Sequence, residues 1–238
     1  STGMSSLAAK NALVNAGADV NARDNAGKTV LTHCKNADAR KVLIAAGAEA
    51  EDVRDNTQDN KYNKNDENDE NDKENEGNKR NEGKATPEAA KTDEIDKTEE
   101  SKDGKTKNLL MYCSFAVEAK KLIQDGADVN GRDNKGMTPL MHCWNADAAK
   151  VLINAGADVN AQDNRGMTPL MHCWKADTAK LLIEAGAAVN GRDNKGMTPL
   201  MNCNDADVAK VLIEAGADAN ARDDSGMTAL MNCNDADV

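Results

Sequence analysis

Aromatic residues are almost absent: the 238-residue chain has one phenylalanine, two tyrosines and two tryptophans. So few rings cannot fill one large globular core, in which aromatic side chains normally supply much of the buried surface. Long apolar runs are missing too, and none approaches the ~18 residues that a membrane-spanning helix needs. No basic and then apolar leader opens the sequence, so we expect neither a secretory signal nor membrane binding.

Positive charge is also in deficit, since the net charge is −11. Most of this deficit is local: residues 51–105 hold 19 acidic and 11 basic side chains, or 11 − 19 = −8, which leaves −3 for the rest. A nearly neutral remainder offers no basic stripe that could follow a phosphate backbone. The sequence therefore predicts no nucleic-acid partner.

A period of 30 residues organises the chain outside this acidic segment. Residues 136–165 return almost unchanged at 166–195 and 196–225, and weaker copies lie at 106–135 and from 27 to about 52. The register is carried by Leu110, Leu140, Leu170, Leu200 and Leu230, and by Cys113, Cys143, Cys173, Cys203 and Cys233. A fixed period of this length is the signature of a stacked array. We therefore predict an all-α solenoid.

The first part of each unit predicts a short helix of about two turns. Thr138 can accept a hydrogen bond from the first turn, and Pro139 suits the first helical position because it has no amide to leave unpaired. Leu140, Cys143 and Trp144 then fall on one helical face.

A second helix is predicted over residues 148–155, capped by Asp147 or Asn145. Its apolar side would consist of Val151, Leu152 and Ala155.

A reaching loop completes the unit. Gly156 suits the left-handed position just beyond a helix, residues 158–160 read as extended, and residues 163–166 have the Asp-x-x-Gly form of a type I turn. We expect Asp163 and Asp193 to accept local backbone hydrogen bonds. The asparagines at Asn130, Asn160, Asn190 and Asn220 are expected to form a structural ladder. Because such short helices are marginal alone, stacking of neighbouring units must stabilise them.

Two runs carry a family resemblance: Gly166-Met167-Thr168-Pro169-Leu170, and residues 156–161 with the letters GADVNA. They resemble the TPL and GADVNA motifs of ankyrin repeats, and the resemblance covers the chain except about residues 51–105. These units have 30 residues instead of the usual 33, and methionine stands where a histidine often follows TPL. The resemblance implies stacked helix-turn-helix units with hairpin loops, and protein binding along a concave groove.

The array is interrupted by an insertion of 49 residues, because a unit expected at 57 begins at 106. Its letters are mostly Asn, Asp, Glu, Lys and Gly, which cannot bury enough apolar surface to offset chain entropy, so we expect disorder. The predicted organisation is repeats over 1–52, the first one partial; a disordered acidic insertion over 53–105; and repeats over 106–238, the last one partial. Either the repeats on both sides of the insertion stack directly, which we favour because about three repeats are needed for stability, or the first ones form a separate module.

The spacing of acidic residues and of histidines allows two kinds of metal site to be assessed. Asp72, Glu74, Glu76 and Gly77 imitate half of an EF-hand loop, but Gly83 replaces its bidentate glutamate. His33, His142 and His172 each precede a cysteine, yet adjacent helical residues point about 100° apart, so we expect no metal.

The cysteines recur one repeat apart, roughly 8–10 Å between stacked helices, too far for a disulfide. We expect buried, reduced thiols and hence a cytoplasmic protein.

The functional signal lies in a row of methionines at a position that faces the concave groove in ankyrin repeats. Met137, Met167, Met197 and Met227 would form this row, flanked by the loop tips Asn134, Lys135, Asn164, Arg165, Asn194 and Lys195. Methionine suits adaptable protein binding, although these side chains could instead pack on their neighbours. Trp144 and Trp174 could anchor a partner or fill space left by the shortened helices; the sequence leaves both open.

The predicted function is a non-enzymatic scaffold that binds a protein partner through its concave face, as a monomer and without cofactors. No nucleophile–base pair or phosphate-binding loop is visible in the sequence. Two alternatives stay open: a targeting arm of a larger enzyme or effector whose catalytic domain lies outside this chain, and a passive spacer.

Overall fold

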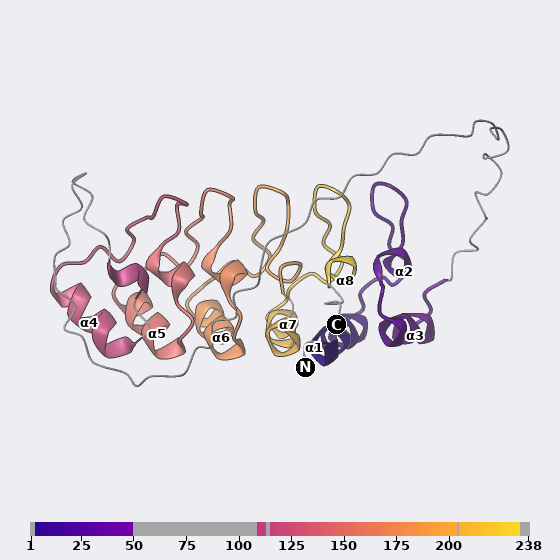
Figure 1. The fold of residues 1–238 in the computed structure, drawn as a ribbon, viewed down its shortest axis with the longest axis horizontal. Coiled ribbons are helices and arrows are strands. Elements are labelled where there is room, and N and C mark those ends of the chain that lie inside the picture. The colour runs from indigo at the N-terminus through magenta and orange to yellow at the C-terminus, as the bar shows by residue number, and fades with distance from the viewer. Residues whose placement is uncertain (1–2, 50–108, 113–114, 204, 234–238) are drawn as a thin grey trace, which may run out of the picture. The chain divides into compact units, whose positions relative to one another are not determined.

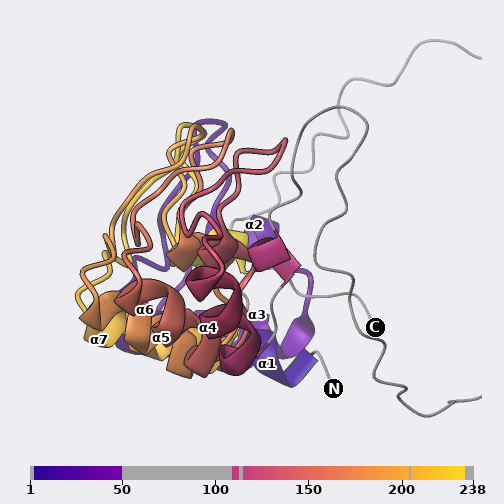
Figure 2. The ribbon, with the colours of Figure 1, turned by 90° about the vertical axis from the view of Figure 1, so that its left-hand side faces the viewer.

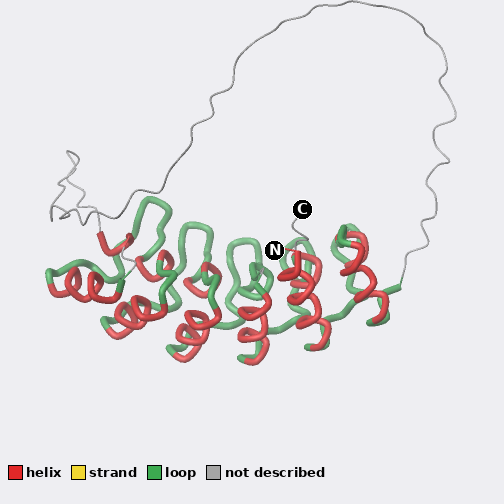
Figure 3. Tube along the Cα trace, turned by 60° about the horizontal axis from the view of Figure 1, so that its bottom comes forward, coloured by secondary structure: helices red, strands yellow, loops and turns green. Residues whose placement is uncertain are grey.

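The computed structural model describes residues 3–49, 109–112, 115–203 and 205–233, and within them the predicted solenoid is confirmed (Figure 1). Units of two short helices and a loop stack side by side. The loops of successive units project together on the same side of the helices (Figure 2). These residues contain no β-strand, only an isolated antiparallel bridge between Arg23 and Thr29 (Figure 3). The acidic insertion, with its calcium-like run, lies outside the described residues.

The first helix is a single turn in five of the described units, shorter than predicted, and in the unit 196–225 the equivalent residues 199–202 form only a turn. The five single-turn helices are η1 (Leu109–Tyr112), η2 (Pro139–His142), η3 (Pro169–His172), α8 (Ala229–Asn232) and α2 (Val30–His33). The chain turns extended at Cys143, with φ −86° and ψ 116°. Trp144 therefore lies beyond the helix and, against prediction, does not share the buried face of Leu140 and Cys143.

The second helices form the other layer of the stack: α1 (Gly3–Asn15), α3 (Ala37–Ala45), α4 (Ala116–Gln124), α5 (Ala146–Asn154), α6 (Ala176–Glu184) and α7 (Ala206–Glu214). Helix α5 begins two residues before the predicted start. Its cap is Asn145 and not Asp147, because Asn145 Oδ1 accepts the N–H groups of Asp147 at 2.8 Å and Ala148 at 3.3 Å. Two orphan amides of the first turn are thereby satisfied.

The core lies between the two helical layers and consists of leucine and alanine. Leu140, Leu152, Ala148 and Ala149 are buried, and so are their equivalents in most units. Ala155, predicted to be apolar-facing, is exposed because it follows the last helical residue as the C-cap. Each fully buried leucine contributes roughly 1.5–3 kcal/mol relative to an exposed one. Layered small and branched side chains thus replace the aromatic core that the sequence cannot build.

The threonine before each first helix does not cap it, against expectation. Thr138 makes no side-chain capping bond in the described structure, and its buried hydroxyl has no hydrogen-bond partner there. The neighbouring Met141 is buried against it, and its sulfur accepts the Thr138 backbone N–H at 3.4 Å. A thioether cannot donate to the hydroxyl, so the methionine copies leave this buried oxygen unpaired.

Each loop is held by the predicted turn. Gly166 N–H donates to the Asp163 carbonyl at 2.9 Å, and Asp163 Oδ1 accepts the N–H groups of Arg165 and Met167. Asp193 accepts the same two local bonds in the next unit, so the predicted role of both aspartates is confirmed. Residues 158–160 are not extended as predicted, because Asp158 Oδ1 accepts the Asn160 N–H at 2.9 Å and closes a turn.

Asparagine side chains join neighbouring units, as predicted. Asn160 Nδ2 donates to the Gly186 carbonyl at 3.0 Å, and its Oδ1 accepts the Ala188 N–H at 2.8 Å. Asn130 and Asn190 make the equivalent pair of bonds to the units that follow them. Each rung connects backbone groups that would otherwise be left to solvent at the edge of the stack.

The N-terminal repeats pack on the C-terminal end of the array. Helix α1 lies against α7, and α2 lies against α8 (Figure 1). The ladder continues across this contact, where Asn220 Nδ2 donates to the Gly17 carbonyl at 3.1 Å and Asn25 N–H donates to the Ser225 carbonyl at 3.0 Å. The arrangement favoured from the sequence, stacking of residues 27–50 on the unit that begins at 106, is therefore wrong.

The physical reason is that two half-units complement each other. Residues 226–233 supply a first helix, α8, and α1 supplies a second helix of the same register. Lys10 on α1 is 1% exposed and its Nζ donates to the Cys233 carbonyl at 3.0 Å. Arg40 makes the equivalent bond to the Cys34 carbonyl, at 3.2 Å, inside a unit that is continuous in sequence. The composite unit thus reproduces the internal contacts of a continuous one.

Candidate functional site

The methionine row predicted from the sequence is half-buried. The N–H of Met137 donates to Asp133 Oδ1 at 2.9 Å, and its carbonyl accepts the Asp133 N–H at 3.0 Å. Met167, Met197 and Met227 make the same two bonds with the aspartate of their own turn. Their backbone is therefore fixed while the flexible side chain reaches the surface. Met197 and Met227 also pack partly on the core.

The loop tips combine exposed charge with structural bonding. Asn164 N–H donates to the Lys135 carbonyl at 3.0 Å, and its Nδ2 donates to the Asn134 carbonyl at 3.2 Å. Asn194 repeats both bonds on the unit before it. The Asn tips thus hold successive loops together, while the side chains of the other tips, Lys135, Arg165 and Lys195, are exposed at their edge.

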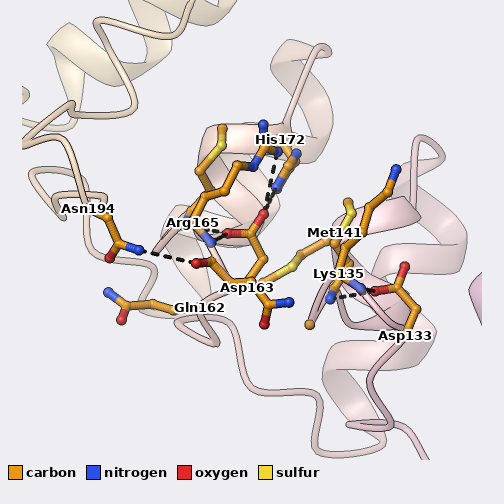
Figure 4. A network of polar contacts seen from close by, with 12 residues as sticks. Asp133, Lys135, Met141, Gln162, Asp163, Arg165, His172 and Asn194 are labelled. Carbon is orange, nitrogen blue, oxygen red and sulfur yellow. Dashed lines mark hydrogen bonds and ion pairs between the residues drawn. The ribbon is translucent and has the colours of Figure 1, made fainter.

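In three units a histidine–aspartate pair connects the loop to the first helix that follows, and sequence reasoning missed these pairs. His172 Nε2 lies 3.2 Å from Asp163 Oδ2, with side chains 14% and 1% exposed (Figure 4). His142 pairs with Asp133 at 3.1 Å and His33 with Asp24 at 2.9 Å. A carboxylate can only accept, so each Nε2 donates. The nine-residue spacing from Asp to His, repeated in three units, was the available signal.

Burial dominates the electrostatics of the most enclosed pair. It lowers the pKa of His172, although the hydrogen bond and charge of Asp163 act in the opposite direction. Burial would raise the pKa of Asp163, but the N–H groups of Met167 and Arg165 and the bond to His172 outweigh it, and this pKa is lowered. A neutral histidine donating to an ionised aspartate is the form that the fold favours.

Both tryptophans lie on the surface of the stack. Trp144 is 75% exposed and Trp174 is 76% exposed, so neither fills space inside the stack. They line an open cavity of about 360 Å³ between neighbouring units, together with Cys143, His172, Lys175 and Thr178. No acidic side chain lines this cavity, and most of its surface is apolar.

The amino end of α6 opens at this cavity without a cap. Lys175 occupies the cap position and makes no side-chain capping bond, whereas Asn36, Asn145 and Asp205 cap α3, α5 and α7. Phe115 occupies the cap position of helix α4 and makes no side-chain capping bond either. Thr178 in the first turn of α6 is 3% exposed, and its hydroxyl has no hydrogen-bond partner among the described residues.

The five cysteines that the structure describes form no disulfide, and four of them are buried, as predicted. Cys34, Cys143, Cys173, Cys203 and Cys233 are free. Burial raises the pKa of Cys203 to about 12, even though its Sγ donates to the Asp205 carbonyl at 3.1 Å. Burial raises the pKa of Cys143 and Cys173 in the same direction. The thiolate form is therefore suppressed, which makes these groups poor nucleophiles.

The described residues hold no cluster of three or more His, Cys, Asp or Glu side chains that could bind a metal ion. Over the same ranges, no helix is long and apolar enough to cross a membrane.

The fold is a repeat solenoid, since pairs of helices stack on one another and hydrogen bonds join their successive loops. A family model described as ankyrin repeats (3 copies) matches residues 88–163 and 144–223. The chain belongs to the ankyrin repeat family. Repeats of this family are generally protein–protein interaction modules and are typically non-catalytic. No curated protein sequence matches the chain significantly.

Proposed function

We propose that this chain is a non-enzymatic scaffold that binds a protein partner along the concave face of its repeat array. The observation that carries the proposal is the methionine row. In four units, a half-exposed methionine stands at the same register position, with its backbone fixed by the turn aspartate. A row of flexible, polarisable side chains on a rigid support suits a protein ligand whose contacts vary along its length.

The loop tips supply the second part of this surface. Exposed Lys135, Arg165 and Lys195 recur beside the methionines at intervals of 30 residues. Their charge complements a partner segment with an acidic rim, and the bonds between successive loops limit the entropy lost on binding. The predicted binding residues are the methionine row and the loop tips, with Trp144 and Trp174 as a separate pair; the tips are Asn134, Lys135, Asn164, Arg165, Asn194 and Lys195. The free thiols favour a reducing, cytoplasmic compartment.

The test is a comparative pull-down from cell lysate, read by quantitative mass spectrometry. The bait is the chain, and the variant carries serine at Met137, Met167, Met197 and Met227. A protein retained by the chain and depleted by the variant supports the proposal, provided that circular dichroism gives both baits the same helix content.

A matched control replaces four exposed residues of the second helices, Lys150, Lys180, Glu184 and Glu214, by serine, which leaves the net charge unchanged. We expect this control to retain the partner. If the methionine variant retains every protein that the chain retains, the row only packs on its neighbours and the proposal fails.

A further inference from the structure

The cavity between the two tryptophans combines apolar walls with unsatisfied hydrogen-bond donors at one helix end. In the first turn of α6, the N–H groups have no intrahelical acceptor, and Lys175 at the cap position cannot accept one. In α5 and α7 the carboxylate or amide oxygen of the cap residue accepts two of these N–H groups. At α6 the same acceptor must come from elsewhere.

A second, independent feature points to an external ligand. Thr178 lines the cavity, is 3% exposed and has an unpartnered hydroxyl. The equivalent residues of the units on either side are the apolar Ala148 and Val208, which leave no polar atom there. A buried hydroxyl without a partner costs free energy that a bound acceptor would recover.

We propose that the Trp144–Trp174 cavity binds an acidic side chain of a partner peptide that is flanked by bulky apolar residues. The carboxylate accepts from the N–H groups at the start of α6 and from the Thr178 hydroxyl, and it pairs with the Lys175 ammonium. The apolar neighbours pack on the two indole rings. This inference rests on the proposed function, because it names the partner chemistry of an additional surface for protein binding.

Charge decides between this ligand and a cationic one. Paired tryptophans also suit a quaternary ammonium group, but no carboxylate lines the cavity to balance the charge of such a ligand. Lys175 would repel a cation, and the positive end of the α6 dipole favours an anion. The volume, about 360 Å³, lies at the small end of ligand pockets and accommodates a few side chains.

The two tryptophans are the only ones in the chain, so their intrinsic fluorescence reports on this cavity alone. The probes are two acetylated and amidated tripeptides, leucine–glutamate–leucine and leucine–glutamine–leucine. We expect a saturable change in emission with the glutamate peptide and about tenfold weaker binding of the glutamine peptide, since one charge-assisted contact is lost. Equal binding of the two, or no change in emission, would overturn the proposal.

The decisive variant is Lys175→Asn. It supplies the cap that Asn145 provides in α5, so we expect a higher melting temperature together with loss of glutamate-peptide binding. Loss of binding therefore cannot be ascribed to unfolding. The control Lys150→Asn removes the same charge from an exposed position of α5 and should bind like the unaltered chain. Unchanged binding by Lys175→Asn would contradict the proposal.

A third peptide, acetylated leucine–glutamine–leucine with a free carboxyl end, tests the source of the carboxylate. Tighter binding of this peptide than of the glutamate peptide would assign the cavity to chain ends and overturn the side-chain proposal. The pull-down separates this proposal from the scaffold function. Partners lost with the methionine variant but retained by Lys175→Asn, with no fluorescence response, would leave the scaffold standing and refute the cavity.

Discussion

Asp19 donates its backbone N–H to Asn220 Oδ1 at 2.7 Å, although 201 residues separate them along the chain. The same asparagine donates to the Gly17 carbonyl, so one side chain joins the N-terminal loop to the last complete C-terminal unit. The bonds have the form of those that Asn190 makes between two consecutive units. The contact between chain ends is thus built from the ordinary interaction between repeats.

Asn220→Ala should loosen the N-terminal repeats selectively. Two hydrogen bonds are lost, which costs about 1–3 kcal/mol at that contact. Hydrogen exchange should then accelerate in α1 and α3 while α5 and α6 keep their protection. The matched control Asn190→Ala removes the same two bonds between consecutive units, and we expect it to affect α6 and α7 instead. Unchanged protection of α1 in Asn220→Ala would show that the ladder does not hold this contact.

Acid should destabilise the array through the His172–Asp163 pair. The pKa of His172 is lowered in the folded chain, so the unfolded chain takes up the proton first. Stability is therefore present above the unfolded pKa, about 6.5, and is lost as pH falls through the folded value. The pKa of Asp163 is also lowered, so a second loss follows below about pH 4.

Urea unfolding of the chain and of His172→Asn at pH 7, 6 and 5 measures this effect. Asparagine occupies the equivalent position 202, and at pH 7 the variant should lose about 1 kcal/mol with the hydrogen bond. It should also lose part of the pH dependence between 7 and 5. An identical pH dependence in both proteins would mean that His172 does not contribute to it.

Features that repeat along the chain could be predicted from the sequence. The 30-residue register placed Leu140 and Leu170 in the core, the Asp-x-x-Gly signal placed the turn at Asp163, and the recurrence of Asn160 indicated a ladder. Each of these features arises from the local geometry of one unit and recurs in the next unit of the stack. A fixed sequence period therefore indicates it directly.

Features that depend on which segments meet could not be predicted in this way. The nine-residue interval between Asp163 and His172 runs from a loop into a helix. It therefore matches neither the helical nor the strand periodicity. The contact between α1 and α7 joins segments that are far apart in the sequence. The order of the repeats along the chain does not indicate such a contact. The exposure of Trp144 followed from an early helix end at His142, and helix boundaries are the least certain part of a pattern.

Gly136→Ala should be costlier than Gly156→Ala, although both glycines have positive φ, +75° and +91°. Alanine at Gly156 meets no atom within 4 Å, so only the left-handed backbone is penalised, by about 1–2 kcal/mol. A Cβ at Gly136 would lie 3.0 Å from the Asn164 backbone nitrogen and closer still to its Oδ1. We expect roughly 2 kcal/mol more from this overlap, measured by urea unfolding; equal losses would contradict the close packing of successive loops.

Thr168→Val should stabilise the chain, whereas Thr29→Val should destabilise it. The Thr168 hydroxyl is buried beside Met171 without a hydrogen-bond partner in the described structure, and removing it recovers a desolvation cost of about 1 kcal/mol. Thr32 occupies the methionine position in the N-terminal unit, and its hydroxyl lies 3.2 Å from that of Thr29, so valine at 29 breaks a bond of about 0.5–1 kcal/mol. Both threonines have extended backbone, which valine also adopts, so the two changes differ chiefly in that bond. Thermal unfolding of both variants checks this: a lower melting temperature for Thr168→Val would mean that the Thr168 hydroxyl is paired in solution.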